Sequence, residues 1–210
     1  MSLFKAPQAP KLPKIACIGT VTSVAETKAS SSGQYNVTNI TIEPIGGGIN
    51  ARLSLLTRPE WLAPNYNPDV ALDGQKGPKF VYSTNIAGPS GAPIGRLLGL
   101  AGSEEAANSL AERIFAAVST TKDEDGNDVS YVPDAKLDEV LQTLVGTTVG
   151  YVMTQKLEQT EEVDEAGKKI RVRTNNYEFG EFFYPTEKAL AKYRKLATDR
   201  PEDWRVGFDQ

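Results

Sequence analysis

The chain has 210 residues, of which 40% are hydrophobic and 24% charged, so it is long enough for one sizeable core. It contains one cysteine, Cys17, and no histidine, which excludes intrachain disulfide bonds, zinc sites of cysteine and histidine, and Ser-His-Asp catalysis. The formal net charge is −4, so a nucleic-acid ligand would have to bind a local basic patch rather than a basic protein as a whole.

The first segment, residues 1–13, is predicted to be a flexible arm because it has prolines at positions 7, 10 and 13 and no hydrophobic period. It lacks the apolar run of a secretory signal, and no apolar stretch of the chain approaches the roughly 20 residues that cross a bilayer. We therefore expect a cytoplasmic protein without a membrane span, which for a viral chain means the host cytoplasm.

Three strands are predicted next. Residues 14–27 and 35–45 are rich in β-branched side chains, and the turn-forming residues 30–33 between them indicate a hairpin. The glycines at 46–48 end the second strand, and a third strand follows over residues 50–57.

Residues 58–146 are predicted to be an irregular and helical insertion. Prolines and glycines interrupt residues 58–102, where only a short strand is expected, at 79–83. Apolar residues at helical spacing then predict one helix over 103–118 and a second over 134–145.

Two further strands and a helix complete the predicted order. Residues 147–158 and 168–184 flank a charged segment that ends in Gly167, which predicts a long hairpin with an exposed tip. Residues 186–197 have the spacing of an amphipathic helix, and residues 198–210 are expected to form a C-terminal tail.

The resulting order is three strands, a helical insertion, two strands and a helix. It predicts a mainly β chain with helices, of the α+β class, in which residues 14–197 form one domain. The expected architecture is a five-stranded antiparallel OB-like barrel, with the insertion between strands three and four and a C-terminal helix. Folds of this type commonly bind single-stranded nucleic acid.

Two segments carry a family resemblance. Residues 144–153 (LVGTTVGYVM) and 175–185 (NNYEFGEFFYP) resemble the OB-fold single-stranded-DNA-binding proteins encoded by bacteriophages, in which a long hairpin precedes an Asn-aromatic segment and a C-terminal helix. The resemblance implies sequence-tolerant binding of single-stranded DNA in replication or recombination, without catalysis. It also implies an acidic C-terminal tail that recruits partner enzymes, and the present tail departs from that pattern because it also contains Arg200 and Arg205.

The predicted nucleic-acid site lies mainly on the second hairpin. Alternation along a strand places Lys169, Arg171 and Arg173 on one face, a basic stripe of the kind that follows phosphates. Aromatic side chains on the strands are candidate platforms for stacked bases. The predicted binding residues are Tyr35, Arg52, Tyr151, Lys156, Lys169, Arg171, Arg173, Tyr177 and Phe182. Two alternatives stay open, namely pairing of the cations with glutamates across the hairpin, and a core role for the aromatics.

The expected tail carries Trp204 and Phe208, which are candidate contacts for replication or recombination proteins. Docking of these two side chains on their own chain is the alternative. A different function also stays open: a structural or adaptor protein of a virus with no affinity for nucleic acid, for which a homo-oligomer is expected.

No cofactor or metal ion is expected. The acidic loop 122–128 does not fit a calcium-binding EF-hand, because with Gly126 at the sixth position the first and twelfth are Thr121 and Val132. The carboxylates cluster in loops rather than on rigid strands, which disfavours magnesium-dependent chemistry on nucleic acid. We therefore predict a binding protein and not an enzyme, and the choice between DNA and RNA stays open.

Overall fold

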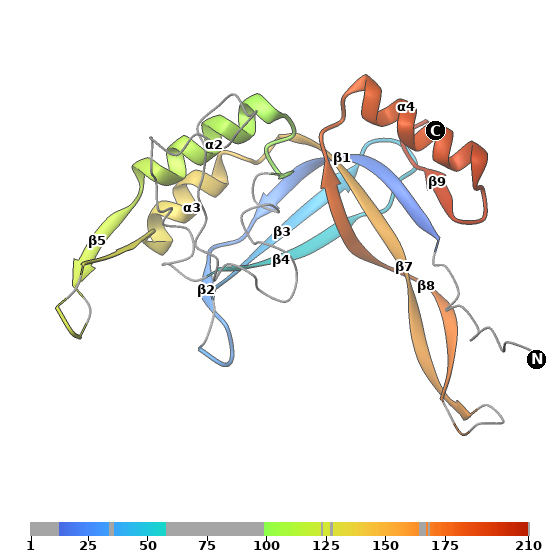
Figure 1. Cartoon of the computed structure of the whole chain (residues 1–210), viewed down its shortest axis with the longest axis horizontal. Helices are drawn as coiled ribbons and strands as arrows, with labels where there is room; N and C mark the ends of the chain where they lie inside the picture. Colours follow the sequence, from blue (N-terminus) through green and yellow to red (C-terminus); the bar gives the residue numbers. More distant parts are fainter. Residues whose placement is uncertain are drawn as a thin grey trace, which may run out of the picture.

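The computed structural model of the chain describes residues 13–33, 36–57, 99–122, 124–126, 128–163, 167 and 169–209. A seven-stranded sheet dominates these residues, and helices pack at both of its ends (Figure 1). Its strands are β1 (Lys14–Val24), β2 (Lys28–Ala29), β3 (Asn36–Pro44), β4 (Ala51–Thr57), β7 (Thr148–Val163), β8 (Lys169–Phe183) and β9 (Trp204–Val206). The remaining elements are the two-stranded hairpin β5 (Ser119–Lys122) and β6 (Asp128–Tyr131) and the helices α2 (Glu104–Ala116), α3 (Asp134–Gln142) and α4 (Glu187–Asp199).

Strand β1 organises the sheet because it pairs with several other strands. Its residues 14–20 pair antiparallel with β7, and its residues 19–24 pair antiparallel with β3. Strand β4 adds to β3 and β8 adds to β7, so the order is β4-β3-β1-β7-β8, with β2 on β3. The mainly β, α+β class is confirmed. The sheet is open within the described residues and has seven strands, so the predicted five-stranded OB-like barrel is wrong in its strand number and in being a barrel.

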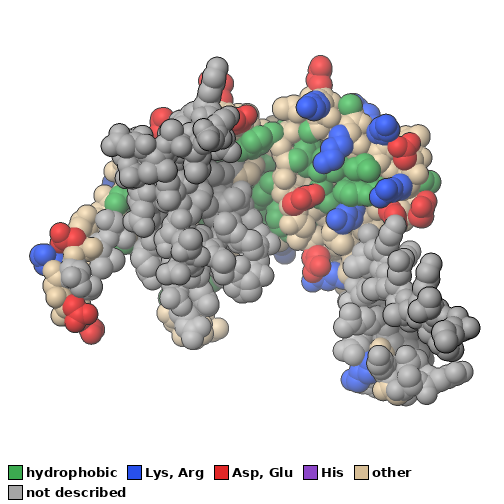
Figure 2. Space-filling model, in the orientation of Figure 1, with side chains coloured by type: hydrophobic (Ala, Val, Ile, Leu, Met, Phe, Trp, Pro, Cys, Tyr) green, Lys and Arg blue, Asp and Glu red, His purple; other side chains and the backbone are tan. Residues whose placement is uncertain are grey.

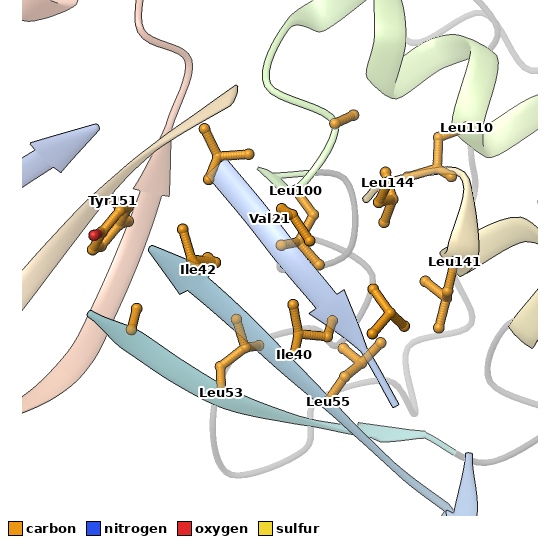
Figure 3. Close-up of a cluster of buried hydrophobic side chains, with 14 of the residues drawn as sticks. Val21, Ile40, Ile42, Leu53, Leu55, Leu100, Leu110, Leu141, Leu144 and Tyr151 are labelled. Atoms are coloured by element: carbon orange, nitrogen blue, oxygen red, sulfur yellow. The ribbon is translucent and has the colours of Figure 1, made fainter. Parts of the chain in front are cut away.

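The main core lies on one face of this sheet (Figure 3). Because side chains alternate along a strand, β1, β3, β4 and β7 each place every second residue in the core. Examples are Val21, Ile40, Ile42, Leu53, Leu55 and Tyr151, which are all at most 5% exposed. Helices α2 and α3 cover the end of the core with Leu110 and Leu141, which are both fully buried.

The predicted helices form close to their expected bounds, and two of them begin at a capping side chain. The Ser103 hydroxyl accepts a hydrogen bond from the Ala106 N–H at 3.1 Å, which satisfies a free donor in the first turn of α2. The Thr186 hydroxyl accepts from the Ala189 N–H at 3.3 Å at the start of α4. After α3 the chain turns back through Gly146, whose φ of +89° favours glycine.

Helix α3 is fixed to the sheet by polar side chains as well as apolar ones. The Asp138 carboxylate accepts hydrogen bonds from the Thr27 N–H at 3.1 Å and from the Thr27 hydroxyl at 2.5 Å. The Gln142 amide donates to the Val24 carbonyl at 2.8 Å. Asp138 and Gln142 are four residues apart and share one side of the helix, which therefore faces the end of β1.

Two expected loops are ordered structure instead. Of the acidic loop, Lys122 and Asp128 pair with each other at the ends of β5 and β6, and Gly126 turns between them with a φ of +83°. The expected tail contains β9, which pairs in parallel with residues 14–16 of β1. The expected arm up to residue 12, the residues 58–98 and the strand at 79–83 lie outside the described residues.

A second, smaller core explains why the C-terminal segment folds back. Ala16 and Val152 lie on the opposite face of the sheet from the main core, and Tyr193 of α4 covers them with only 4% exposure. The Lys14 N–H donates to the Asp203 carbonyl at 2.8 Å, and the Gly207 N–H donates to the Ala16 carbonyl at 2.9 Å. These bonds complete the edge of β1 that β3 does not reach.

Candidate nucleic-acid interface

The second hairpin, β7–β8, extends beyond the body of the sheet (Figure 1). Pairing between β1 and β7 ends at Thr154, and β7 continues to Val163 in register with β8. The register shifts at three places along this hairpin. Such bulges increase twist and turn a hairpin out of the plane of its sheet.

The backbone register bears on the choice between phosphate contacts and cross-strand ion pairs. Arg171 pairs with Gln159, and Arg173 pairs with Leu157. Glu158 stands opposite Val172. No glutamate is therefore directly opposite either arginine, whereas directly opposed charges are what stabilises an antiparallel pair.

Three further predicted cations are exposed at different places on the sheet. Lys169 begins β8 beside the hairpin tip, and Lys156 lies on β7 where the hairpin leaves the sheet. Arg52 is on β4 opposite Thr41, so β3 and β1 lie between it and β7 in the hydrogen-bonded order. The hairpin therefore gathers four of the five predicted cations, and Arg52 belongs to the other half of the sheet.

Tyr151 lies in the main core and has no exposed surface. Its hydroxyl donates a hydrogen bond to the Ile49 carbonyl at 2.6 Å. Burial, with the Cys17 thiol nearby, raises the pKa of Tyr151 well above its ordinary value. A base cannot stack on a ring without exposed surface, so the core role that we kept as the alternative is the one this structure supports.

Tyr177 and Phe182 are half-buried and pack against the main core. Phe179, which we did not predict, joins them, with its ring centroid 4.6 Å from that of Phe182. Residues three apart in a regular strand lie on opposite faces of the sheet. Phe179 and Phe182 instead pair with Met153 and Tyr151, whose side chains both point into the core. A register shift between these pairs brings both rings to one face.

Gly180 lies at this register shift, and a Cβ there would lie 3.0 Å from the Val152 carbonyl oxygen, a close contact that would require a small shift of the backbone. A glycine inside a strand pattern is a signal for a bulge, and it could have located Phe179. The remaining predicted aromatic, Tyr35, lies outside the described residues.

Trp204 and Phe208 pack on the second core. They therefore dock on their own chain, which was the alternative to a contact with a partner protein. The Trp204 ring lies 5.5 Å from that of Tyr193 between centroids. The Arg194 guanidinium lies 5.4 Å from the centre of the Phe208 ring and forms an ion pair of 2.6 Å with Asp209. That hydrogen-bonded pair lowers the pKa of Asp209. Both predicted aromatics remain partly exposed at the surface.

Within the described residues, no group of three or more cysteine and carboxylate side chains converges to hold a metal ion. Cys17 is buried, and burial raises the pKa of its thiol, which disfavours a reactive thiolate. None of the helices in the described part of the chain is long and apolar enough to cross a membrane. Comparison with protein-family models, curated proteins and solved structures gave no match to the chain.

Proposed function

We propose that the protein binds single-stranded DNA without sequence preference and without catalysis, in DNA replication or recombination of a bacteriophage. The β7–β8 hairpin is the principal contact, and its cations bind the phosphates. Counterion release makes such binding strong at low salt and insensitive to base sequence.

The strand order supports this proposal. Strands β1, β3 and β4 come first, α2 and α3 follow, and β7 and β8 come last, with β1 pairing with both β3 and β7. An OB-fold places its strands and helix in this order, and many OB-folds bind single strands. The resemblance of residues 144–153 and 175–185 to phage proteins points the same way.

The observation that carries the proposal is the register of the hairpin. Arg171 and Arg173 lie where no glutamate is directly opposite, on a segment that pairs only with β7 among the strands of the described residues. Arginine is suited to phosphate contact because its planar fork of donors matches phosphate oxygens. Tyr177 lies four residues along the same strand and is partly exposed, so it is the nearest candidate for base stacking.

A salt titration with fluorescently labelled oligo(dT) tests the proposal by anisotropy. We expect micromolar or tighter binding at low salt that weakens steeply as salt rises. The Arg171→Gln/Arg173→Gln variant removes two phosphate contacts and should lower the slope of log affinity against log salt by about 1.4, at about 0.7 for each contact.

The matched control is Lys122→Gln/Lys136→Gln, which removes the same number of positive charges but from β5 and α3, and leaves the β7–β8 hairpin unchanged. It should bind like the wild type. Wild-type protein that shows no salt-sensitive binding at micromolar concentration would overturn the proposed function.

One observation favours a second candidate, a structural or adaptor role. The β5–β6 and β7–β8 hairpins extend in different directions from the body (Figure 1), and projecting hairpins are able to pair with neighbouring chains. This role predicts an oligomer that forms with rising concentration whether or not oligonucleotide is present. Sedimentation velocity with and without oligo(dT) separates the two functions.

A further inference from the structure

The exposed side of α4 carries a row of lysines that the hairpin site does not include. Lys188, Lys192 and Lys195 are all exposed, whereas Tyr193 faces the sheet. A rise of about 1.5 Å per residue separates successive lysines by about 6 and 4.5 Å along the helix. In the region of α4 and β9, Figure 2 shows several Lys and Arg side chains, together with acidic ones, around a hydrophobic patch.

A chain of ring contacts joins this row to β1. The Lys192 ammonium lies 5.2 Å from the centre of the Tyr193 ring, and that ring lies 5.5 Å from the Trp204 ring. The Lys14 ammonium lies 5.3 Å from the centre of the Trp204 ring on β9. We call Lys14, Lys188, Lys192, Lys195 and Trp204 the C-terminal basic surface.

The carboxylates near this row are Glu187 and Asp199 at the ends of α4, Glu181 on β8, Glu202 and Asp203 just before β9, and Asp209 after it. Glu187 begins α4 and Asp199 ends it, so the exposed charges between them are all cationic. Asp209 is hydrogen-bonded to Arg194, which keeps that carboxylate on the guanidinium. Glu181 on β8 faces Tyr193 from the sheet side. The helix therefore presents a local positive row in a chain of net charge −4.

The C-terminal basic surface adjoins the base of the β7–β8 hairpin. Lys14 pairs with Thr154 of β7 and with Trp204 of β9, so it sits at the junction of these strands. Lys156 is two residues beyond Thr154, at the point where the hairpin leaves the sheet. Lys156 and Lys14 thus lie between the base of the hairpin and α4.

We propose that the C-terminal basic surface is a second contact region for the same single strand, an inference that rests on the proposed function. The three α4 lysines and Lys14 bind successive phosphates, and a base stacks on the partly exposed Trp204 ring. An anionic membrane is a poorer fit, because the apolar side chains around α4, such as Leu196 and Phe208, are partly buried against the second core rather than fully exposed for insertion.

Fluorescence of Trp204 gives a direct test, because Trp61 is the other tryptophan of the chain. In the Trp61→Phe variant, stacking of a base should quench the remaining emission as oligo(dT) is added, and the quenching should saturate together with anisotropy of the labelled oligonucleotide. Binding that leaves the emission unchanged would remove Trp204 from the site. The charge variants below do not depend on the folding of Trp61→Phe.

The Lys188→Gln/Lys192→Gln/Lys195→Gln variant removes three proposed phosphate contacts. It should weaken binding by about tenfold to a hundredfold near 0.1 M salt and lower the salt slope by about 2. Its matched control, Lys28→Gln/Lys122→Gln/Lys136→Gln, removes the same number of positive charges but from β2, β5 and α3, and should bind like the wild type. Circular dichroism confirms that both variants are folded.

The outcomes separate this inference from the proposed function. If the wild type binds and only the Arg171/Arg173 variant weakens, the hairpin alone is the site and the inference is overturned while the function stands. If the wild type does not bind oligo(dT), both are overturned. If Trp204 emission responds to vesicles of phosphatidylserine and phosphatidylcholine but not to oligo(dT), the surface is a lipid contact and the inference is overturned.

Discussion

Replacing Tyr151 with phenylalanine removes one buried hydroxyl and leaves the ring in place. In the structure that hydroxyl donates to the Ile49 carbonyl at 2.6 Å, and Tyr151 has no exposed surface. The substitution leaves the carbonyl without this donor. We expect a loss of about 1.5 kcal/mol in the free energy of unfolding, which for a chain of this size lowers Tm by roughly 3–6 °C.

The same substitution should change the alkaline limit of stability. Burial raises the pKa of Tyr151 in the folded protein, whereas an unfolded tyrosine has a pKa of about 10. Above that pH the unfolded chain has released a proton that the folded protein still holds, so stability falls as pH rises. Tyr151 contributes fully below about pH 10 and progressively less above it. Tyr151→Phe should therefore lose less stability than the wild type between neutral pH and pH 11.

Urea unfolding followed by circular dichroism, at neutral pH and at pH 11, measures both effects. Anisotropy with labelled oligo(dT) is the companion assay, and it should show an affinity within about twofold of the wild type because the ring has no exposed surface to offer a base. A variant with unchanged stability and tenfold weaker binding would refute this reasoning, because it would place the hydroxyl on the ligand rather than on Ile49.

Two further predictions concern packing around the sheet. Asp138→Ala deprives the Thr27 N–H and hydroxyl of their acceptor and should lower the free energy of unfolding, measured in urea, by about 2–3 kcal/mol. Asp138→Asn keeps one acceptor oxygen and should lose less. Equal losses in the two variants would argue against these hydrogen bonds. Gly150→Ala would put a Cβ 2.5 Å from the Phe183 ring and should lower the free energy of unfolding by about 1–3 kcal/mol. Combining it with Phe183→Leu in a double-mutant cycle should recover part of that loss. Strictly additive losses would contradict the contact.

Local patterns were sufficient for most of the elements. Alternating β-branched residues and helical spacing predicted the main strands and three helices near their observed bounds, because these signals reside in the side chains of each segment. The caps Ser103 and Thr186 were also predictable, since a cap bonds only to the next turn of its own helix. The β5–β6 hairpin was missed because its tip, with Gly126, reads as a solvated loop.

The candidate site was less accessible from sequence for a geometric reason. A register shift of one residue exchanges the two faces of a strand, and the bulge near Gly180 brings Phe179 and Phe182 to the same face. Tyr151 and Tyr177 lie on the two strands of the same hairpin, yet one is fully buried and the other partly exposed. Burial of each depends on which elements cover that part of the sheet.

The sequence by itself determined which side chains are available: no histidine, one cysteine, and a basic stripe in the segment that forms β8. It also determined an order of strands and helices of the α+β class. Only the tertiary structure decided that the sheet is open and that Arg171 and Arg173 have no glutamate directly opposite. It also decided that Trp204 docks beside Lys14. These features depend on strand register and on contacts between residues distant in the chain, for which hydrophobic spacing within one segment carries no information.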